Sequence, residues 1–180
     1  QELGLESGEY LLYVSRFEPE NNPDRVVAAY RNVDGSRPLV MVGGAPSARG
    51  LTRRVAELAD ERVLLPGPIY GEGYRQLLFN CRTYIHATEV GGTHPALVEA
   101  MGAGRPVLYY DTPENREVAG DVGLRFRFGG DDSLERVIGE VIDDEERLQD
   151  MGRSSRQRVE ERYRWSDVAD RYEKVLEGLC

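Results

Sequence analysis

Residues 83–110, TYIHATEVGGTHPALVEAMGAGRPVLYY, contain two short apolar runs with a helical stretch between them. The runs at 83–87 and 106–110 are nearly continuous in apolarity, which is typical of strands buried on both faces of a sheet. Between them, Pro95 opens the helical stretch and Gly104 ends it. The order strand, helix, strand predicts parallel strands within one sheet.

The same alternation extends along most of the chain. Further strands are predicted at 10–15, 38–43, 62–67 and, more weakly, 122–126. Helices are predicted at 23–33, where Asn22 is the expected cap, and at 48–59, 73–81 and 112–119. Right-handed crossovers allow few other arrangements, so the pattern predicts an α/β fold: a doubly wound, mostly parallel six-stranded Rossmann-like sheet flanked by helices.

The carboxyl-terminal segment is predicted to be helical throughout. Apolar residues recur at spacings of three and four within 133–178, which predicts three helices broken near Asp143 and at 164–166. The many charges between them are interpreted as solvated helix faces. We expect residues 1–180 to form a single domain.

Composition excludes several classes of protein. The chain has 180 residues, of which 40% are hydrophobic, which is enough for one core. Its net charge of −9 argues against a general affinity for nucleic acid or anionic membranes. Cys81 and Cys180 predict neither a disulfide framework nor a zinc site, and a cytoplasmic location fits them. No run approaches the roughly 20 apolar residues of a membrane span.

Ligands of doubly wound sheets bind outside the carboxyl ends of the strands. The first four strands lead there into SRFEPENN (15–22), GGAPSARG (43–50), PGPIYGEG (66–73) and ATEVGGTHP (87–95). Small residues and charges gather in these segments, so we expect a cleft. The fingerprint Gly-x-Gly-x-x-Gly does not follow the first strand, which runs into Arg16, and this disfavours a nicotinamide dehydrogenase.

The segment that starts the central helix is predicted to bind phosphate. Gly91, Gly92 and Thr93 precede the helix, where unpaired amides and the helix dipole attract an anion and glycines permit its close approach. Glu99 lies one turn inside, about 6 Å of rise from Pro95. A carboxylate there can accept hydrogen bonds from a ribose whose phosphates lie at the helix start. The alternative is an acid that simply faces solvent.

Taken together, these stretches resemble the retaining glycosyltransferases of the two-domain GT-B fold, specifically family four, also called group 1. The resemblance covers the whole chain as the carboxyl-terminal, donor-binding half, and it rests on the order of 10–24, 38–46, 62–89 and 91–126. It implies a separate amino-terminal acceptor domain outside this chain. It also implies that a last helix, 165–179, crosses to that domain.

The resemblance implies roles for the matched positions. Arg16 resembles the family's diphosphate-binding arginine, although an arginine at a strand end is as often plain surface charge. Glu99 resembles the second glutamate of the family's paired-glutamate motif, which holds the ribose. Gly92 and Thr93 resemble the backbone donors near the phosphates and the sugar.

Three further positions fall where the family contacts the nucleoside. Gly43 resembles the small residue that lets the nucleotide pack on the second loop, and a plain turn glycine is an equally good interpretation. Pro68 and Ile69 fall where the family offers backbone groups to the base.

Two positions depart from the family pattern. The family's glutamates have seven residues between them, which would place the first at Gly91, whereas this chain has Glu89. Either the loop is longer and Glu89 still reaches the sugar, or that contact is missing. The second departure is Asn21, which stands where the family often has a phosphate-binding lysine. The negative charge that develops on the leaving diphosphate must then depend more on Arg16 and the helix start.

Histidines and tyrosines near these loops allow two interpretations each. His94 would either donate to a phosphate or cap the helix, and His86 is expected as a core residue with its hydrogen bonds made rather than as a catalyst. Tyr70 and Tyr74 would stack on a base, although Tyr74 has the spacing of a packed helix residue.

The sequence therefore predicts the donor-binding domain of a transferase that moves a hexose, mannose- or rhamnose-like, from a nucleotide diphosphate sugar to a glycan or lipid-linked acceptor. Retention of configuration and the lack of any cofactor or obligatory metal are implied by the resemblance. The chain alone is expected to bind nucleotide without transferring sugar, and the longer protein is expected to be peripheral at the cytoplasmic face of a membrane. Alternatives are a non-catalytic nucleotide-sugar-binding subunit and a GT-B-type epimerase.

Overall fold

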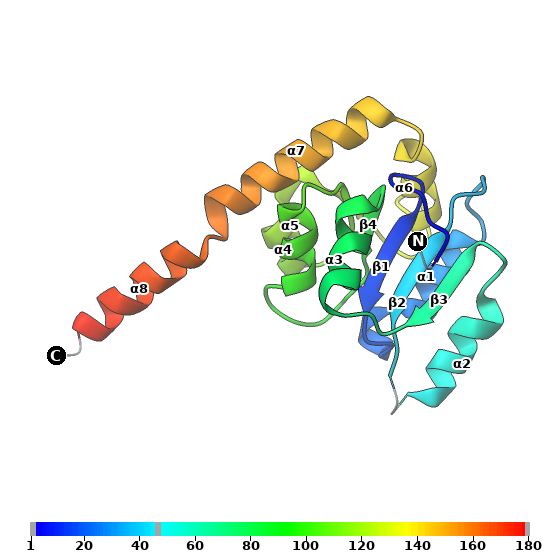
Figure 1. The fold of residues 1–180 in the computed structure, drawn as a ribbon, viewed down its shortest axis with the longest axis horizontal. Helices are drawn as coiled ribbons and strands as arrows, with labels where there is room; N and C mark the ends of the chain where they lie inside the picture. Colours follow the sequence, from blue (N-terminus) through cyan, green and yellow to red (C-terminus); the bar gives the residue numbers. More distant parts are fainter. Residues whose placement is uncertain (1–2, 46–47, 179–180) are drawn as a thin grey trace.

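The computed structural model describes residues 3–45 and 48–178. Six strands form one sheet in the order β3-β2-β1-β4-β5-β6, and every neighbouring pair is parallel (Figure 1). The strands are β1 (Leu11–Ser15), β2 (Leu39–Gly43), β3 (Val63–Gly67), β4 (Thr83–His86), β5 (Val107–Tyr110) and β6 (Leu124–Phe126). The predicted doubly wound sheet is confirmed, and it is parallel throughout.

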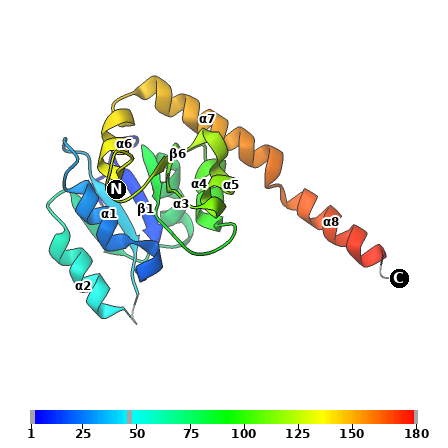
Figure 2. The same cartoon turned by 180° about the vertical axis from the view of Figure 1, so that it is seen from behind.

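Helices cover both faces of the sheet. They are α1 (Pro23–Tyr30), α2 (Arg49–Leu58), α3 (Gly71–Asn80), α4 (Pro95–Gly102), α5 (Pro113–Ala119), α6 (Leu134–Val141), α7 (Glu145–Arg162) and α8 (Trp165–Glu177), with short 3₁₀ turns at Pro19–Asn21 and Gly120–Val122. Residues of α1, α2 and α6 share one buried cluster with the sheet, on the face seen in Figure 2. Residues of α3, α4 and α5 share the other cluster, so alternate side chains of each central strand enter opposite cores.

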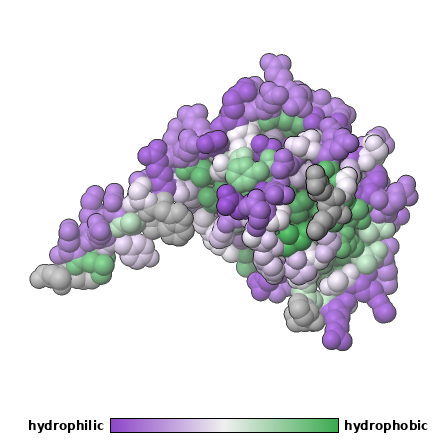
Figure 3. Space-filling view, viewed as in Figure 1, coloured by the Kyte–Doolittle hydropathy of each residue, from purple (hydrophilic) through white to green (hydrophobic). Residues whose placement is uncertain are grey.

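The edge strand β3 is less buried than its sequence predicts. The central strands β1, β2, β4 and β5 are almost wholly buried, whereas Leu65 of β3 is 36% exposed. β3 is the outermost strand on its side of the sheet and has a neighbouring strand on one side only. Its other side therefore remains partly open to solvent. The space-filling view in Figure 3 shows hydrophobic residues at the surface of the domain.

The carboxyl-terminal helices break close to the predicted positions, although the second break lies slightly before the predicted 164–166. α6 ends before Asp143, and α7 and α8 are separated at residues 163–164. Figure 1 shows α8 extending away from the body, where Tyr172, Val175 and Leu176 are more than 60% exposed. The last residue of the predicted terminal helix, Leu179, and also Cys180, lie outside the described residues. Within 3–45 and 48–178, no helix is both long and apolar enough to cross a membrane.

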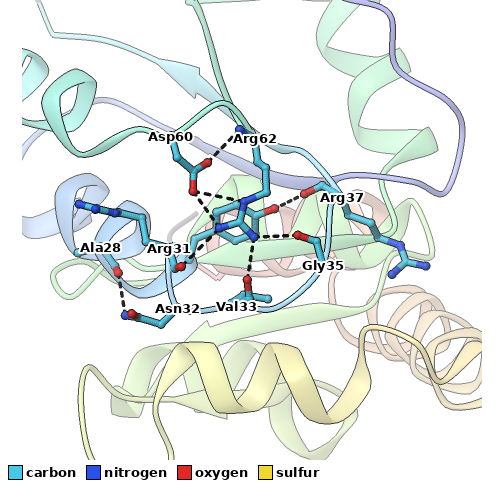
Figure 4. Close-up of polar contacts among 9 residues, drawn as sticks. Ala28, Arg31, Asn32, Val33, Gly35, Arg37, Asp60 and Arg62 are labelled. Carbon is cyan, nitrogen blue, oxygen red and sulfur yellow. Dashed lines mark hydrogen bonds and ion pairs between the residues drawn. The ribbon is translucent and has the colours of Figure 1, made fainter.

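Arg62 ties together the loops at the amino-terminal edge of the sheet (Figure 4). Its guanidinium donates to the Asp60 carboxylate at 2.8 Å and to the carbonyl oxygens of Val33 and Gly35 at 2.7 and 2.9 Å. It also lies 4.9 Å from the centroid of the Tyr30 ring. One side chain thus satisfies several carbonyls of the loop between α1 and β2.

Candidate functional site

The loops that follow β1 and β4 meet at the point where the strand order reverses, which is the usual ligand site of such sheets. Three hydrogen bonds join them. The Thr88 hydroxyl donates to Asn21 Oδ1 at 3.0 Å, the Glu89 amide donates to the Glu20 carbonyl at 2.8 Å, and Asn22 Nδ2 donates to the Ala87 carbonyl at 2.9 Å. The two loops therefore form one rigid floor.

Asn21 and Asn22 are framework residues of this floor. Asn21 is buried, and its side-chain amide also donates to the Arg16 carbonyl at 2.8 Å. Its hydrogen-bonding groups are thus directed at the protein. Asn22 has a left-handed backbone with φ of 54°, and its side chain makes no capping bond to α1. Asn22 therefore occupies the predicted N-cap position, but its Oδ1 accepts from Arg25 Nη1 at 3.3 Å instead of from a backbone amide of α1.

Arg16 lies at the rim of the floor. Its side chain is 76% exposed, and its recorded partner is Glu18, with 3.1 Å between Nη1 and Oε1. An exposed pair of this kind contributes little free energy. The guanidinium can therefore leave Glu18 for a stronger anion at small cost.

Gly43 and Pro68 bring the second and third loops next to the first. Gly43 has φ of 153°, and a Cβ atom there would lie 1.8 Å from the Ser15 carbonyl oxygen. Close approach of two backbones, rather than a turn alone, thus requires this glycine. The Pro68 ring packs beside Gly44. Ile69 instead packs on Gly73 and lines a hollow of about 890 Å³ under the amino-terminal segment.

A pair of histidines lies beneath the glycine loop. The rings of His86 and His94 are 4.8 Å apart, and a Cβ on Gly91, whose φ is 140°, would lie 2.6 Å from the His94 ring. His94 is the N-cap residue of α4, but its side chain makes no capping hydrogen bond to the described part of the helix. By contrast, a side chain at Gly92 would meet no atom within 4 Å, so the space beside this exposed loop is open.

His86 is buried but lacks the hydrogen bond expected of a core histidine. Its Nε2 and the Oδ1 of Asn115 have no hydrogen-bond partner among the described residues, although Asn115 Nδ2 donates to the Thr88 and Tyr110 carbonyls at 2.9 Å each. Burial lowers the pKa of His86 to about 3, the His94 ring adds to this shift, and Asn115 opposes it. Burial also lowers the pKa of His94, against an opposing effect of Glu114. Both rings are therefore neutral near pH 7.

Glu99 lies on α4 between its buried residues Leu97 and Ala100 and contacts α3. Its Oε2 accepts a hydrogen bond of 2.7 Å from the Tyr74 hydroxyl, while the carboxylate remains exposed. Burial, followed by this bond to Glu99, raises the pKa of Tyr74. A carboxylate has further acceptor sites, so Glu99 can still receive hydroxyl donors from a ligand. The helical spacing of Tyr74 predicted packing but gave no signal of this bond.

Glu89 faces an arginine that the sequence did not single out. Its Oε1 lies 3.3 Å from Nη1 of Arg25, and that guanidinium lies 4.1 Å from the ring centroid of Phe128. The three residues come from different segments of the chain, so no local spacing predicted their contact. Within 3–45 and 48–178, no three His, Cys, Asp or Glu side chains group as a metal site would require.

Fold and site together define a Rossmann-like α/β domain whose switch point carries a glycine loop, a helix start and an exposed arginine. The chain belongs to the family described as Glycosyl transferases group 1, whose model matches residues 1–158. It thereby confirms the group 1 resemblance seen in the sequence.

Individual relatives agree with this assignment. The chain is 26% identical to the phosphatidylinositol N-acetylglucosaminyltransferase gpi3 subunit of Schizosaccharomyces pombe, over 94% of this chain and 38% of that protein. It is 27% identical to a GDP-mannose-dependent α-(1-6)-phosphatidylinositol monomannoside mannosyltransferase of Mycobacterium tuberculosis, over 92% and 46%. The structure of Anabaena HepE with UDP and glucose superimposes with a TM-score of 0.86 at 18% identity, over 98% of this chain and 50% of that one. The chain thus spans half or less of these proteins.

Proposed function

We propose that this chain is the carboxyl-terminal, donor-binding domain of a retaining GT-B glycosyltransferase. It would supply the donor site for transfer of a mannose- or rhamnose-like hexose from a nucleotide diphosphate sugar to a glycan or lipid-linked acceptor. One observation carries the proposal: the open glycine loop and the start of α4 lie at the switch point that Arg16 borders, with Glu99 one turn inside the helix. The sugar-nucleotide chemistry named for the mycobacterial relative and for HepE supports it.

The residues suggest how this domain would assist departure of the nucleotide diphosphate. Negative charge would develop on the diphosphate as the glycosidic bond breaks. Arg16 and the amides around Gly92 would stabilise that charge, since fixed donors need no reorganisation during the reaction. No step requires a metal ion. The acceptor would bind against the amino-terminal domain, so this chain alone is expected to transfer no sugar.

Calorimetric titration with UDP, GDP, dTDP and ADP tests the proposal. One nucleotide should bind saturably, and Arg16→Ala and Glu99→Ala should each weaken it about tenfold or more, the effect of losing a charged hydrogen bond. Gly92→Val should abolish binding at unchanged stability because its side chain enters the space where a phosphate would lie. Gly139→Val, at an exposed and equally open position of α6, is the matched control. Binding by Gly92→Val equal to wild type would contradict the proposal.

A non-catalytic nucleotide-sugar-binding subunit is the second candidate. The burial of Asn21 within the floor favours it, because that side chain carries no charge and both its Nδ2 and its Oδ1 already bond to protein groups. Turnover by this chain joined to its amino-terminal domain separates the two. Transfer to a glycan or lipid-linked acceptor supports the enzyme, whereas tight binding without turnover supports the subunit.

A further inference from the structure

Arg25 is held at the carboxyl edge of the sheet by three contacts. Its Nη1 lies 3.3 Å from Glu89 Oε1 and 3.3 Å from Asn22 Oδ1. Its guanidinium carbon lies 4.1 Å from the ring centroid of Phe128, within the range of a cation–π contact. Because the contacts come from the residue before α1, the β4–α4 loop and the segment after β6, the guanidinium has a defined position.

Phe128 is itself anchored in the core. Its ring stacks on Tyr110 at 5.2 Å and meets the edge of Phe126 at 5.4 Å, and Phe126 is fully buried. The arginine therefore rests on a fixed aromatic platform.

The ion pair that Arg25 forms remains accessible. The side chains of Arg25 and Glu89 are 45% and 36% exposed, so their pairing contributes little to folding. Both groups keep unused hydrogen-bonding capacity: a guanidinium has five donors, and a carboxylate has about four acceptor positions. The pair can thus bind a polar ligand without being dismantled.

The sheet order places this pair at one end of a bound donor. Glu99 bonds to Tyr74 of α3, the helix that follows β3, so a ribose held by Glu99 points the nucleoside toward the β3 side. The diphosphate would lie at the start of α4. The sugar beyond the diphosphate would then lie beside Glu89, which precedes Gly91 by two residues, and beside Arg25, which contacts Glu89.

We propose that Arg25 and Glu89 together read two neighbouring hydroxyl groups of a neutral donor hexose. Arg25 donates to one sugar oxygen, and Glu89 accepts from the adjacent hydroxyl. This assignment rests on the proposed function and adds Arg25 as a specificity residue. It also accounts for the nine residues between Glu89 and Glu99, because Arg25 and the Glu89 amide bond to Glu20 fix the start of the longer loop.

The test compares each nucleoside diphosphate with its sugar-linked form. Calorimetry on this chain would use UDP with UDP-glucose, GDP with GDP-mannose and dTDP with dTDP-rhamnose. For the pair that binds most tightly, the dissociation constant of the diphosphate is divided by that of its sugar-linked form. This ratio measures how much the sugar adds to binding. Arg25→Ala and Glu89→Gln should each reduce that ratio about tenfold to a hundredfold, as expected for charged hydrogen bonds, and leave diphosphate affinity within about twofold.

Controls separate sugar recognition from charge and from folding. Arg136→Ala removes an exposed arginine of α6, which pairs with Asp131 at 3.0 Å, and should change neither constant. The double variant Arg25→Ala/Glu89→Gln should lose less than the sum of the single losses, since the two groups act on one sugar. Thermal unfolding of each variant confirms that it is folded.

Each other outcome has a defined meaning. An unchanged ratio in Arg25→Ala, or an equal loss for diphosphate and sugar-linked donor, would overturn the inference. Wild-type binding of diphosphate with no gain from any sugar would overturn it while leaving the donor-domain proposal intact. Failure of wild type to bind any of the six nucleotides would contradict the donor-domain proposal itself, and the inference with it.

Discussion

Arginines have different roles at the two ends of the parallel strands, which are the amino-terminal and the carboxyl-terminal edges of the sheet. At the amino-terminal edge, Arg62, Arg82 and Arg105 all donate to backbone carbonyls of loops and helix ends. The Arg82 and Arg62 side chains are only 10% and 18% exposed. At the carboxyl edge, the Arg16 and Arg25 guanidiniums contact side-chain carboxylates and are 76% and 45% exposed. The same residue type stabilises the fold at one edge and is available to a ligand at the other.

Chain direction explains this division. In a parallel sheet with right-handed crossovers, helices end near the amino edge and begin near the carboxyl edge. Helix ends present unpaired carbonyls, which arginines satisfy, and helix starts present unpaired amides, which anions satisfy. Arg16 and Arg25 beside the helix starts pair with carboxylates instead and add positive charge there, which attracts an anion. A hollow of about 460 Å³ at the amino edge is lined in part by arginines. We interpret these arginines as groups that stabilise the fold and not as a ligand site.

Gly43→Ala at the carboxyl edge is expected to reduce the free energy of unfolding more than any other substitution discussed below. Gly43→Ala places a methyl group 1.8 Å from the Ser15 carbonyl oxygen, so the ends of β1 and β2 must separate. We expect the free energy of unfolding to fall by about 3 kcal/mol or more, as for other changes that strain a backbone. Urea unfolding measures it. Gly139→Ala, at an open helix position, should instead gain about 0.5–1 kcal/mol. Equal stabilities would refute the close-approach argument.

The next effect tests the amino edge. Arg62→Ala leaves the Val33 and Gly35 carbonyls without this donor and Asp60 without its partner. The free energy of unfolding should fall by about 2–3 kcal/mol, while nucleotide affinity stays unchanged. Arg53→Ala is the control, because that side chain is 82% exposed and 4.0 Å from Glu57, and its loss should cost less than about 0.5 kcal/mol. Weaker nucleotide binding by Arg62→Ala would break the division between the edges.

The sequence predicted the fold well because each element carried local signals. Apolar runs and Pro or Gly boundaries placed five strands to within a residue, and the helix predicted at 112–119 is observed as Pro113–Ala119. It also placed Arg16 at the rim and Glu99 on α4. These inferences used spacing along the chain alone.

Contacts between distant segments were not predicted, because spacing along the chain gives no information about them. Glu99 with Tyr74 and Glu89 with Arg25 are 25 and 64 residues apart. Asn21 shows the same limit, since its type indicated a possible ligand donor and its partner at residue 88 made it part of the framework. Side-chain roles at the site depend on the fold bringing such pairs together.

The buried histidine at the carboxyl edge should make stability depend on pH. His86 has a folded pKa of about 3, against about 6.5 in the unfolded chain, so below pH 6.5 the unfolded state binds the additional proton. Its contribution to stability is full above pH 6.5 and declines as pH falls toward 3. Between pH 7 and pH 5 the loss should be about 2 kcal/mol.

Substitution isolates this effect from other titrating groups. His86→Phe removes the titrating group, so the variant should gain about 2 kcal/mol relative to wild type on going from pH 7 to pH 5. Urea unfolding at both values gives the comparison. A difference between the two proteins that stays constant with pH would show that His86 takes up a proton as readily in the folded state as in the unfolded state.

Tyr74→Phe is expected to have the smallest effect, and it tests the role of Glu99 at the carboxyl edge. Tyr74→Phe removes the hydroxyl that donates to Glu99 at 2.7 Å, so the carboxylate loses one fixed orientation but keeps its charge. Nucleoside diphosphate affinity should fall by about 0.5–1 kcal/mol, with stability changed by no more than that. If Glu99 holds the ribose, the Tyr74→Phe loss should shrink when the ribonucleoside diphosphate that binds is replaced by its 2′-deoxy form, because fewer hydroxyls then depend on the carboxylate. A loss that is the same for both nucleotides would mean that Tyr74 acts on the base or on packing, and Glu99 would then be an acid that faces solvent.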